Sequence, residues 1–263
     1  MIKFLERQIE RLGASVLVPI GSLGDVMIFT YQFFYWLVKR PFRSKLFIEQ
    51  LLFVGNKSLF IIFLAGSFTG MVFSYQTYFG FKMISVDSLV GPIVAISLSK
   101  ELAPVLTGLI VAGRAGAAMA AQIGSMKVTE QIDALEVMGI SSHQYLAVPR
   151  IVAGTIAVPM LTVIFNLIGN IGSWFVGTKA LMIDEVMYFS KLGEFMFVED
   201  LLQGIIKAVF FGFIISVVGC YFGFTVEKGA EGVGRGTNLA VVWGMILVLI
   251  LDYFLTSFLI RIL

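Results

Sequence analysis

The chain has 263 residues, of which 58% are hydrophobic and only 14% are charged, and its mean hydropathy is +0.94. A soluble domain carries about 25% charged residues, so this composition excludes a soluble globule and a disordered chain. The net charge of +2 gives no indication of nucleic-acid binding. The single cysteine, Cys220, excludes a disulfide framework and a Cys-based metal site, and the single histidine, His143, leaves almost nothing for His-centred catalysis. The composition predicts an all-α membrane protein with several spans.

The N-terminal segment, residues 1–39, is expected to lie in the membrane interface. Residues 1–13 mix basic and acidic side chains with apolar ones at helical spacing, which is typical of an amphipathic helix and not of a cleaved signal peptide. Residues 12–38 are apolar but contain Asp25. The segment is therefore predicted to lie on or dip into the interface, and a full span over 12–38 is the alternative.

Residues 40–263 form the expected transmembrane domain. A helical span needs about 20 apolar residues, and the intervals between charged residues supply five of them. The expected spans cover residues 58–81, 88–126, 151–178, 205–226 and 236–260. The second span is unusually long and contains Lys100, Glu101 and Arg114, while the fifth contains Asp252. Because charges inside a membrane are costly, such residues are expected to be paired or functional.

The loops predict the orientation of the chain. Residues 1–57 carry eight Lys or Arg against four Asp or Glu, whereas residues 179–200 carry two against five. Basic loops stay in the cytoplasm, so the N-terminus is expected inside and 179–200 outside. With five spans, residues 127–150 and 227–235 are then cytoplasmic.

The cytoplasmic segment 127–150 contains a predicted coupling helix over 129–139, with Thr129 as its N-cap and Gly139 at its end. The helix has one apolar stripe, and its remaining positions are mostly acidic or polar. The apolar residues are Ile132, Leu135 and Met138, and the polar ones are Glu130, Gln131, Asp133 and Glu136. Such a helix could lie on the membrane, serve as a solvated connector, or dock into a groove on a soluble partner. Membrane-surface helices are usually basic, so the acidic face favours docking.

No motif in the chain can bind ATP. The phosphate-binding pattern G-x-x-x-x-G-K-[ST] is missing, and the glycines of residues 232–236 lack its spacing and its lysine. The patterns H-E-x-x-H and G-x-S-x-G are missing too, as is any Cys/His cluster. We therefore expect a transport subunit that is not an enzyme and holds neither a metal nor a cofactor of its own.

Lys100 and Glu101 are the strongest candidates for a polar feature within the spans. Neighbouring residues on a helix point about 100° apart, so the two side chains are expected to face different surroundings. Pro104 frees the carbonyl one turn earlier and allows a kink there. Glu101 could line a substrate path or form an ion pair that fixes helix packing. Lys207, at the start of the fourth apolar stretch, could contact a headgroup or extend to the interface.

Small residues recur at four-residue spacing in residues 112–124 and at Gly66 and Gly70. This pattern allows close contact between helices, either within the chain or between copies.

Residues 98–169 and 229–256 resemble the MlaE (YrbE-type) permease family of lipid ABC transporters. The motifs are an acidic residue before a proline, then AGRAGAA, EQIDALEVMG and EGVGR, in that order. The resemblance covers most of the chain from about residue 40. It implies a five-span permease with an N-terminal interfacial helix that works as a homodimer in the bacterial inner membrane. The implied partners are two copies of a cytoplasmic ATPase, which uses the ATP, and a periplasmic MCE-domain protein, and the implied cargo is phospholipid or a related lipid.

The resemblance also implies roles for individual residues. Those implied for the lipid path are Glu101, Lys100, Gln76, Tyr78 and Lys207. Those implied for coupling to the ATPase are Glu130, Gln131, Asp133, Leu135, Glu136, Met138 and Gly139. Lys100 stands where relatives often have arginine, so it keeps the charge without the bidentate geometry. Two other functions remain open from the residues alone: a secondary transporter or channel that works without an ATPase, and a scaffold subunit without a path of its own.

Overall fold

The computed structural model describes residues 24–39, 43–83, 86–227 and 229–261. Within these residues the regular structure is entirely helical, and five helical stretches are long and apolar enough to cross a membrane, as predicted. They are Ser44–Lys82, Asp87–Val128, His143–Ala180, Val198–Phe224 and Ala230–Leu259. Each begins before the expected span, because charged residues such as Lys57 do not end a helix that continues past the apolar interval.

The second span is interrupted by two short π-helical segments, the third has one at each end, and the other three spans are continuous α-helices. The first span is α2 (Ser44–Lys82), the fourth is α9 (Val198–Phe224) and the fifth is α10 (Ala230–Leu259). The second comprises η1 (Asp87–Leu89), α3 (Val90–Ser97), η2 (Leu98–Leu102), α4 (Ala103–Val111), η3 (Ala112–Gly116) and α5 (Ala117–Val128). The third comprises η4 (His143–Ala147), α7 (Val148–Phe175) and η5 (Val176–Ala180). Pro104 lies just after η2, so the expected irregularity takes the form of a π-helical turn.

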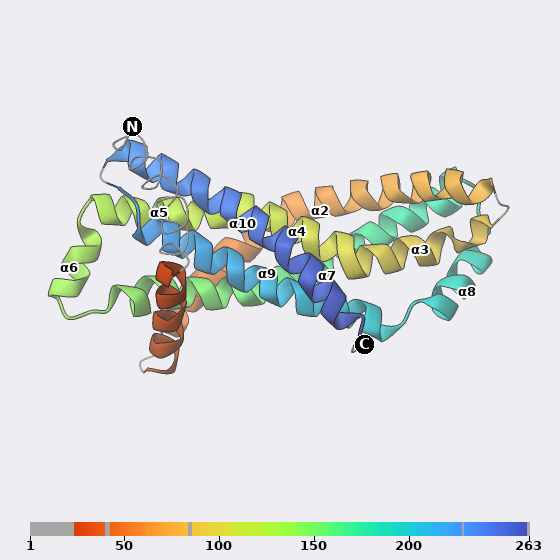
Figure 1. Cartoon of the computed structure of the whole chain (residues 1–263). Coiled ribbons are helices and arrows are strands. Elements are labelled where there is room, and N and C mark those ends of the chain that lie inside the picture. Colours follow the sequence, from red (N-terminus) through yellow and green to blue (C-terminus); the bar gives the residue numbers. More distant parts are fainter. Residues whose placement is uncertain (1–23, 40–42, 84–85, 228, 262–263) are drawn as a thin grey trace, which may run out of the picture.

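Two short helices lie at opposite ends of the bundle (Figure 1). The first, α6 (Gln131–Val137), follows the second span, and the turn from α9 to α10 lies at the same end. The second, α8 (Glu185–Phe195), precedes α9 at the far end. The loops that were assigned to opposite sides of the membrane are therefore at opposite ends of the molecule.

A further helix over residues 24–38 runs across the direction of the spans near the end that carries α6 (Figure 1). It buries Phe29 and Phe33 against the bundle, and the Phe33 ring lies 5.8 Å from that of Phe213 on α9. The interfacial placement of this segment stays a prediction, since the helix crosses the direction of the spans without a membrane to locate it. Residues 1–23 of that predicted segment lie outside the described residues.

The span α9 is the most buried of the five. It packs against α7, α10, α5 and α4, and glycines allow the close approach. A Cβ added to Gly154 of α7 would overlap the Ser216 hydroxyl of α9, and one added to Gly70 of α2 would overlap the backbone carbonyl of Gly169 on α7. Gly154 and Gly70 thus serve contacts between helices within the chain.

Candidate functional site

A cluster of charged and polar side chains joins three spans. Lys207 on α9 places its Nζ atom 2.5 Å from Glu101 Oε2 on η2 and 3.1 Å from Asp252 Oδ1 on α10. The same ammonium donates to Thr256 Oγ1 at 2.6 Å. An ammonium has three N–H donors, so each of them has an acceptor here. We call Lys207, Glu101, Asp252 and Thr256 the ion cluster.

The ion cluster is uneven in both charge and exposure. One ammonium faces two carboxylates, and the Lys207 side chain is 0% exposed while those of Glu101 and Asp252 are 40% and 22% exposed. Burial of the lysine without partners would be prohibitive, so the carboxylates stabilise it. Both carboxylate side chains are thus partly accessible at the surface of the bundle. Glu101 was expected either to line a substrate path or to form an ion pair. The structure shows an ion pair whose carboxylate side chain is also partly accessible.

Lys100 points to a different partner from Glu101, as expected from their angular separation. Its Nζ lies 2.7 Å from Asp200 Oδ1 in the first turn of α9. Asp200 also accepts from the backbone N–H of Phe197 at 3.0 Å and so caps that helix. A cavity of about 520 Å³ adjoins this ion pair. It is lined by Lys100, Phe197, Glu199, Asp200, Gln203, Leu259 and Ile260.

Three other residues that the sequence singled out lie outside the ion cluster. Gln76 is exposed near the end of α2, and the half-buried Tyr78 lies under the Lys82 ammonium, 5.3 Å from its ring centroid. Arg114 on η3 donates to the carbonyl of Phe53 at 3.0 Å and to the Ser58 hydroxyl at 2.8 Å. Arg114 therefore joins the second span to α2.

The sequence missed Asp200 and Thr256 as parts of these sites. Asp252 was expected to be paired or functional, and the structure confirms a pair with Lys207. The sequence signal that could reveal such residues is an ionisable side chain inside an apolar segment, and among these three residues only Asp252 has it. Asp200 sits in an acidic loop, and Thr256 is a residue type that membrane helices commonly contain.

The coupling helix is shorter than predicted and begins at a different cap. Its N-cap is Glu130, which has φ +59°, and not Thr129, whose hydroxyl donates to the Ser125 carbonyl at 2.9 Å and closes α5. The chain must turn sharply between α5 and α6, so the left-handed residue replaces a side-chain cap. Gly139 ends the helix with φ +75°, as predicted, because glycine adopts this conformation without strain.

The faces of α6 differ from those expected from spacing alone. Ile132 is buried and Leu135 is half-buried against the chain's own core. Val137 and Met138 are instead 88% and 65% exposed at its tip, and sequence analysis did not single out Val137. The polar residues Glu130, Gln131, Asp133 and Glu136 are exposed. The accessible surface of α6 is therefore a small apolar tip beside acidic groups.

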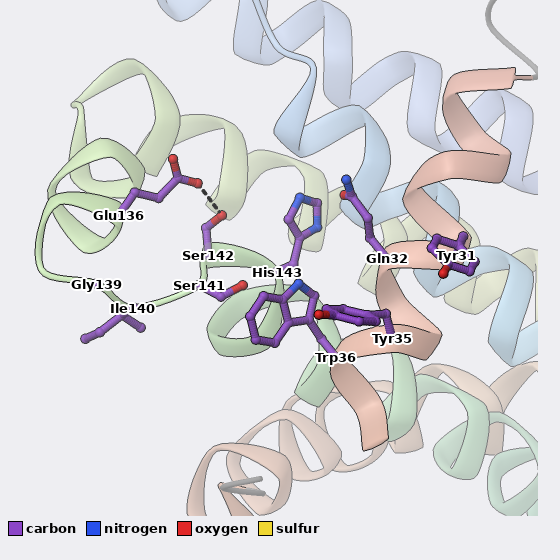
Figure 2. Close-up of a pocket in the computed structure, with 10 residues that line it drawn as sticks. All are labelled: Tyr31, Gln32, Tyr35, Trp36, Glu136, Gly139, Ile140, Ser141, Ser142 and His143. Atoms are coloured by element: carbon purple, nitrogen blue, oxygen red, sulfur yellow. Dashed lines mark hydrogen bonds between the residues drawn. The ribbon is translucent and has the colours of Figure 1, made fainter. Parts of the chain in front are cut away.

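A cavity of about 600 Å³ lies between the helix over residues 24–38 and the loop after α6 (Figure 2). Within it, the Ser142 hydroxyl donates to Glu136 Oε1 at 2.7 Å and ties that loop to α6. The residues that line it are Tyr31, Gln32, Tyr35, Trp36, Glu136, Gly139, Ile140, Ser141, Ser142 and His143.

Comparison with known proteins agrees with this architecture. The sequence profile described as "Permease MlaE" matches residues 47–258. A probable ABC transporter permease protein of Rickettsia typhi is 40% identical over 95% of this chain and 97% of its own length. The intermembrane phospholipid transport system permease protein MlaE of Haemophilus influenzae is 36% identical over 95% and 96%. The chloroplastic protein TRIGALACTOSYLDIACYLGLYCEROL 1 of Arabidopsis thaliana is 36% identical over 80% of this chain and 60% of its own. The chain is thus a multi-pass membrane protein that belongs to the MlaE permease family of ABC transporters.

Proposed function

We propose that this chain is the permease subunit of a transporter that moves phospholipid or a related lipid between the bacterial inner membrane and a periplasmic MCE-domain carrier. Membership of the permease family and the name of the Haemophilus influenzae relative, an intermembrane phospholipid transport permease, support the cargo. A separate cytoplasmic ATPase supplies the energy, since this sequence has no phosphate-binding loop of its own.

The observation that carries the proposal is the partial exposure of Glu101 and Asp252 within two spans. A carboxylate that faces acyl chains costs about 2.5–3.5 kcal/mol on insertion scales. The face with these oxygens is therefore covered by protein or opens into a wet cavity. A second copy of the chain that packs around this face satisfies both conditions, which supports a homodimer with a cavity between its subunits.

Within such a cavity the two kinds of surface have different tasks. Apolar walls hold the acyl chains, while the polar groups near η2 receive the headgroup. Lys100, whose side chain is 36% exposed beside the 520 Å³ cavity, is placed to contact an anionic phosphate. The ion cluster presents carboxylate oxygens on its open side and thereby keeps part of the path polar.

The ATPase is proposed to dock on α6. Val137 and Met138 supply a small apolar anchor, and Asp133 and Glu136 surround it with negative charge. In helix-in-groove binding, an apolar anchor of this kind fills a pocket on the partner. We expect basic side chains of the ATPase to border that pocket. Movement of α6 on ATP binding or hydrolysis would then change the cavity.

Co-expression with the ATPase and reconstitution into proteoliposomes test the proposal. Fluorescent phospholipid should move to or from a soluble MCE carrier when ATP is present. Transfer should stop when the ATPase carries a substitution in its phosphate-binding lysine, which is the matched control. A secondary transporter would instead move its substrate under an ion gradient without ATP, and a scaffold would move none. Either result would overturn the proposal.

A further inference from the structure

The segment that carries α6 runs from residue 127 to residue 143. Both of its ends contact the same residue, Phe224, which is the last residue of α9. At the start of the segment, the Lys127 ammonium donates to the Phe224 carbonyl at 2.5 Å. At its end, the His143 ring stacks on the Phe224 ring, with centroids 5.0 Å apart and planes 11° apart. One contact uses the backbone and the other uses the side chain, so both ends of the segment are joined to the end of α9.

A third element completes this arrangement. Phe29, from the helix over residues 24–38, is 5% exposed and lies 5.2 Å from the His143 ring and 5.7 Å from the Phe224 ring. The hydrogen bond between Ser142 and Glu136 connects α6 to the residue beside His143, as Figure 2 shows. We call Lys127, His143, Phe29 and Phe224 the Phe224 clamp.

The helix that the clamp holds is suited to transmit a displacement. The span α9 is one uninterrupted α-helix from Val198 to Phe224, and it is the most buried of the five. Close-packed interiors respond to strain by shifting as units. Lys207 of the ion cluster lies on the same helix, about 25 Å from Phe224 at about 1.5 Å per residue. Asp200, the partner of Lys100, lies further along it.

We propose that the Phe224 clamp is the point at which movement of α6 is passed to α9, and through it to Lys207 and Asp200 in the transport path. The inference rests on the proposed function and identifies how its two sites communicate. His143 and Phe224 are positioning residues in this scheme, because they act through α9 and not on the lipid itself. The stacked rings and the Lys127 hydrogen bond both resist separation of this segment from the end of α9.

The test compares His143→Ala with His143→Phe in the complete complex with its ATPase. Alanine removes the stacked ring, whereas phenylalanine keeps it. We expect lipid transferred per ATP hydrolysed to fall at least about fivefold in His143→Ala, the lower end of coupling between distant sites. His143→Phe should retain most of the wild-type ratio. The matched control is Phe210→Ala, which removes an exposed ring from the same helix and should leave the ratio unchanged.

A second measurement does not depend on lipid transfer. Leu201→Cys on α9, in a Cys220→Ser background, reports by its thiol-labelling rate whether ATP changes the far half of the helix. We expect ATP to change this rate in the otherwise unaltered chain and in His143→Phe, but not in His143→Ala. Equal responses in all three would overturn the clamp. A wild-type complex that transfers no lipid but shows this labelling pattern would refute the proposed function alone.

Discussion

Replacing Lys207 by methionine removes the ammonium that holds two carboxylates and one hydroxyl across three spans. Glu101 and Asp252 are then left near each other without a counter-charge. Removing one partner of a buried ion pair costs about 3–5 kcal/mol. Here the remaining carboxylates are 40% and 22% exposed, so solvent offsets part of that cost. We expect a loss of about 2–3 kcal/mol in the free energy of unfolding.

Removing a carboxylate instead should be much milder. Glu101→Gln leaves Lys207 neutralised by Asp252 at 3.1 Å, and the glutamine oxygen can still accept a hydrogen bond. The expected cost is about 1 kcal/mol or less. Lipid transfer should nevertheless fall in Glu101→Gln, because the accessible carboxylate lies on the proposed path. The cluster therefore predicts a stability order in which the lysine variant is clearly the worst.

Thermal melting of the purified chain in detergent measures this order. At about 2–4 °C per kcal/mol for a chain of this size, Lys207→Met should melt roughly 5–10 °C below wild type. The triple variant Lys207→Met/Glu101→Gln/Asp252→Asn removes every charge and should recover at least half of that loss. Two results would contradict this account of the ion cluster. One is a melting temperature of Lys207→Met equal to that of the wild type, and the other is a triple variant that is less stable than Lys207→Met alone.

Three further predictions concern other parts of the chain. In a background without the native cysteine, Ser190→Cys should react with a membrane-impermeant thiol reagent added from the periplasmic side, and reaction from the cytoplasmic side alone would reverse the topology. Met138→Asp should abolish co-purification of the ATPase by removing an anchor worth about 2 kcal/mol or more. Met182→Asp, at a methionine that is also exposed and lies near α8, should retain it. Gly70→Ala should lower stability by about 1–3 kcal/mol through overlap with α7. Gly80→Ala, which meets nothing within 4 Å, should be neutral or stabilising, and equal effects of the two would contradict the packing argument.

Much of the architecture follows from local features of the sequence. Five apolar stretches predict five spans because a helix is the main way to satisfy the backbone in lipid, and the structure has five such helices in its described residues. Gly139 ends α6 as predicted, because its left-handed conformation is a property of the residue itself. The opposite placement of α6 and α8 follows from the parity of the spans between them.

The composition of the polar sites depended on tertiary structure. Lys100 and Glu101 are adjacent in the sequence but pair with Asp200 and Lys207, since neighbouring side chains on a helix diverge by about 100° and meet different parts of α9. The accessible residues of α6 were decided in the same way. Leu135 has the helical spacing of an anchor, but the core of this chain already covers part of it, and Val137 is left exposed. Periodicity defines a helix's apolar face, but only the packing of the other helices determines which part of that face remains free for a partner.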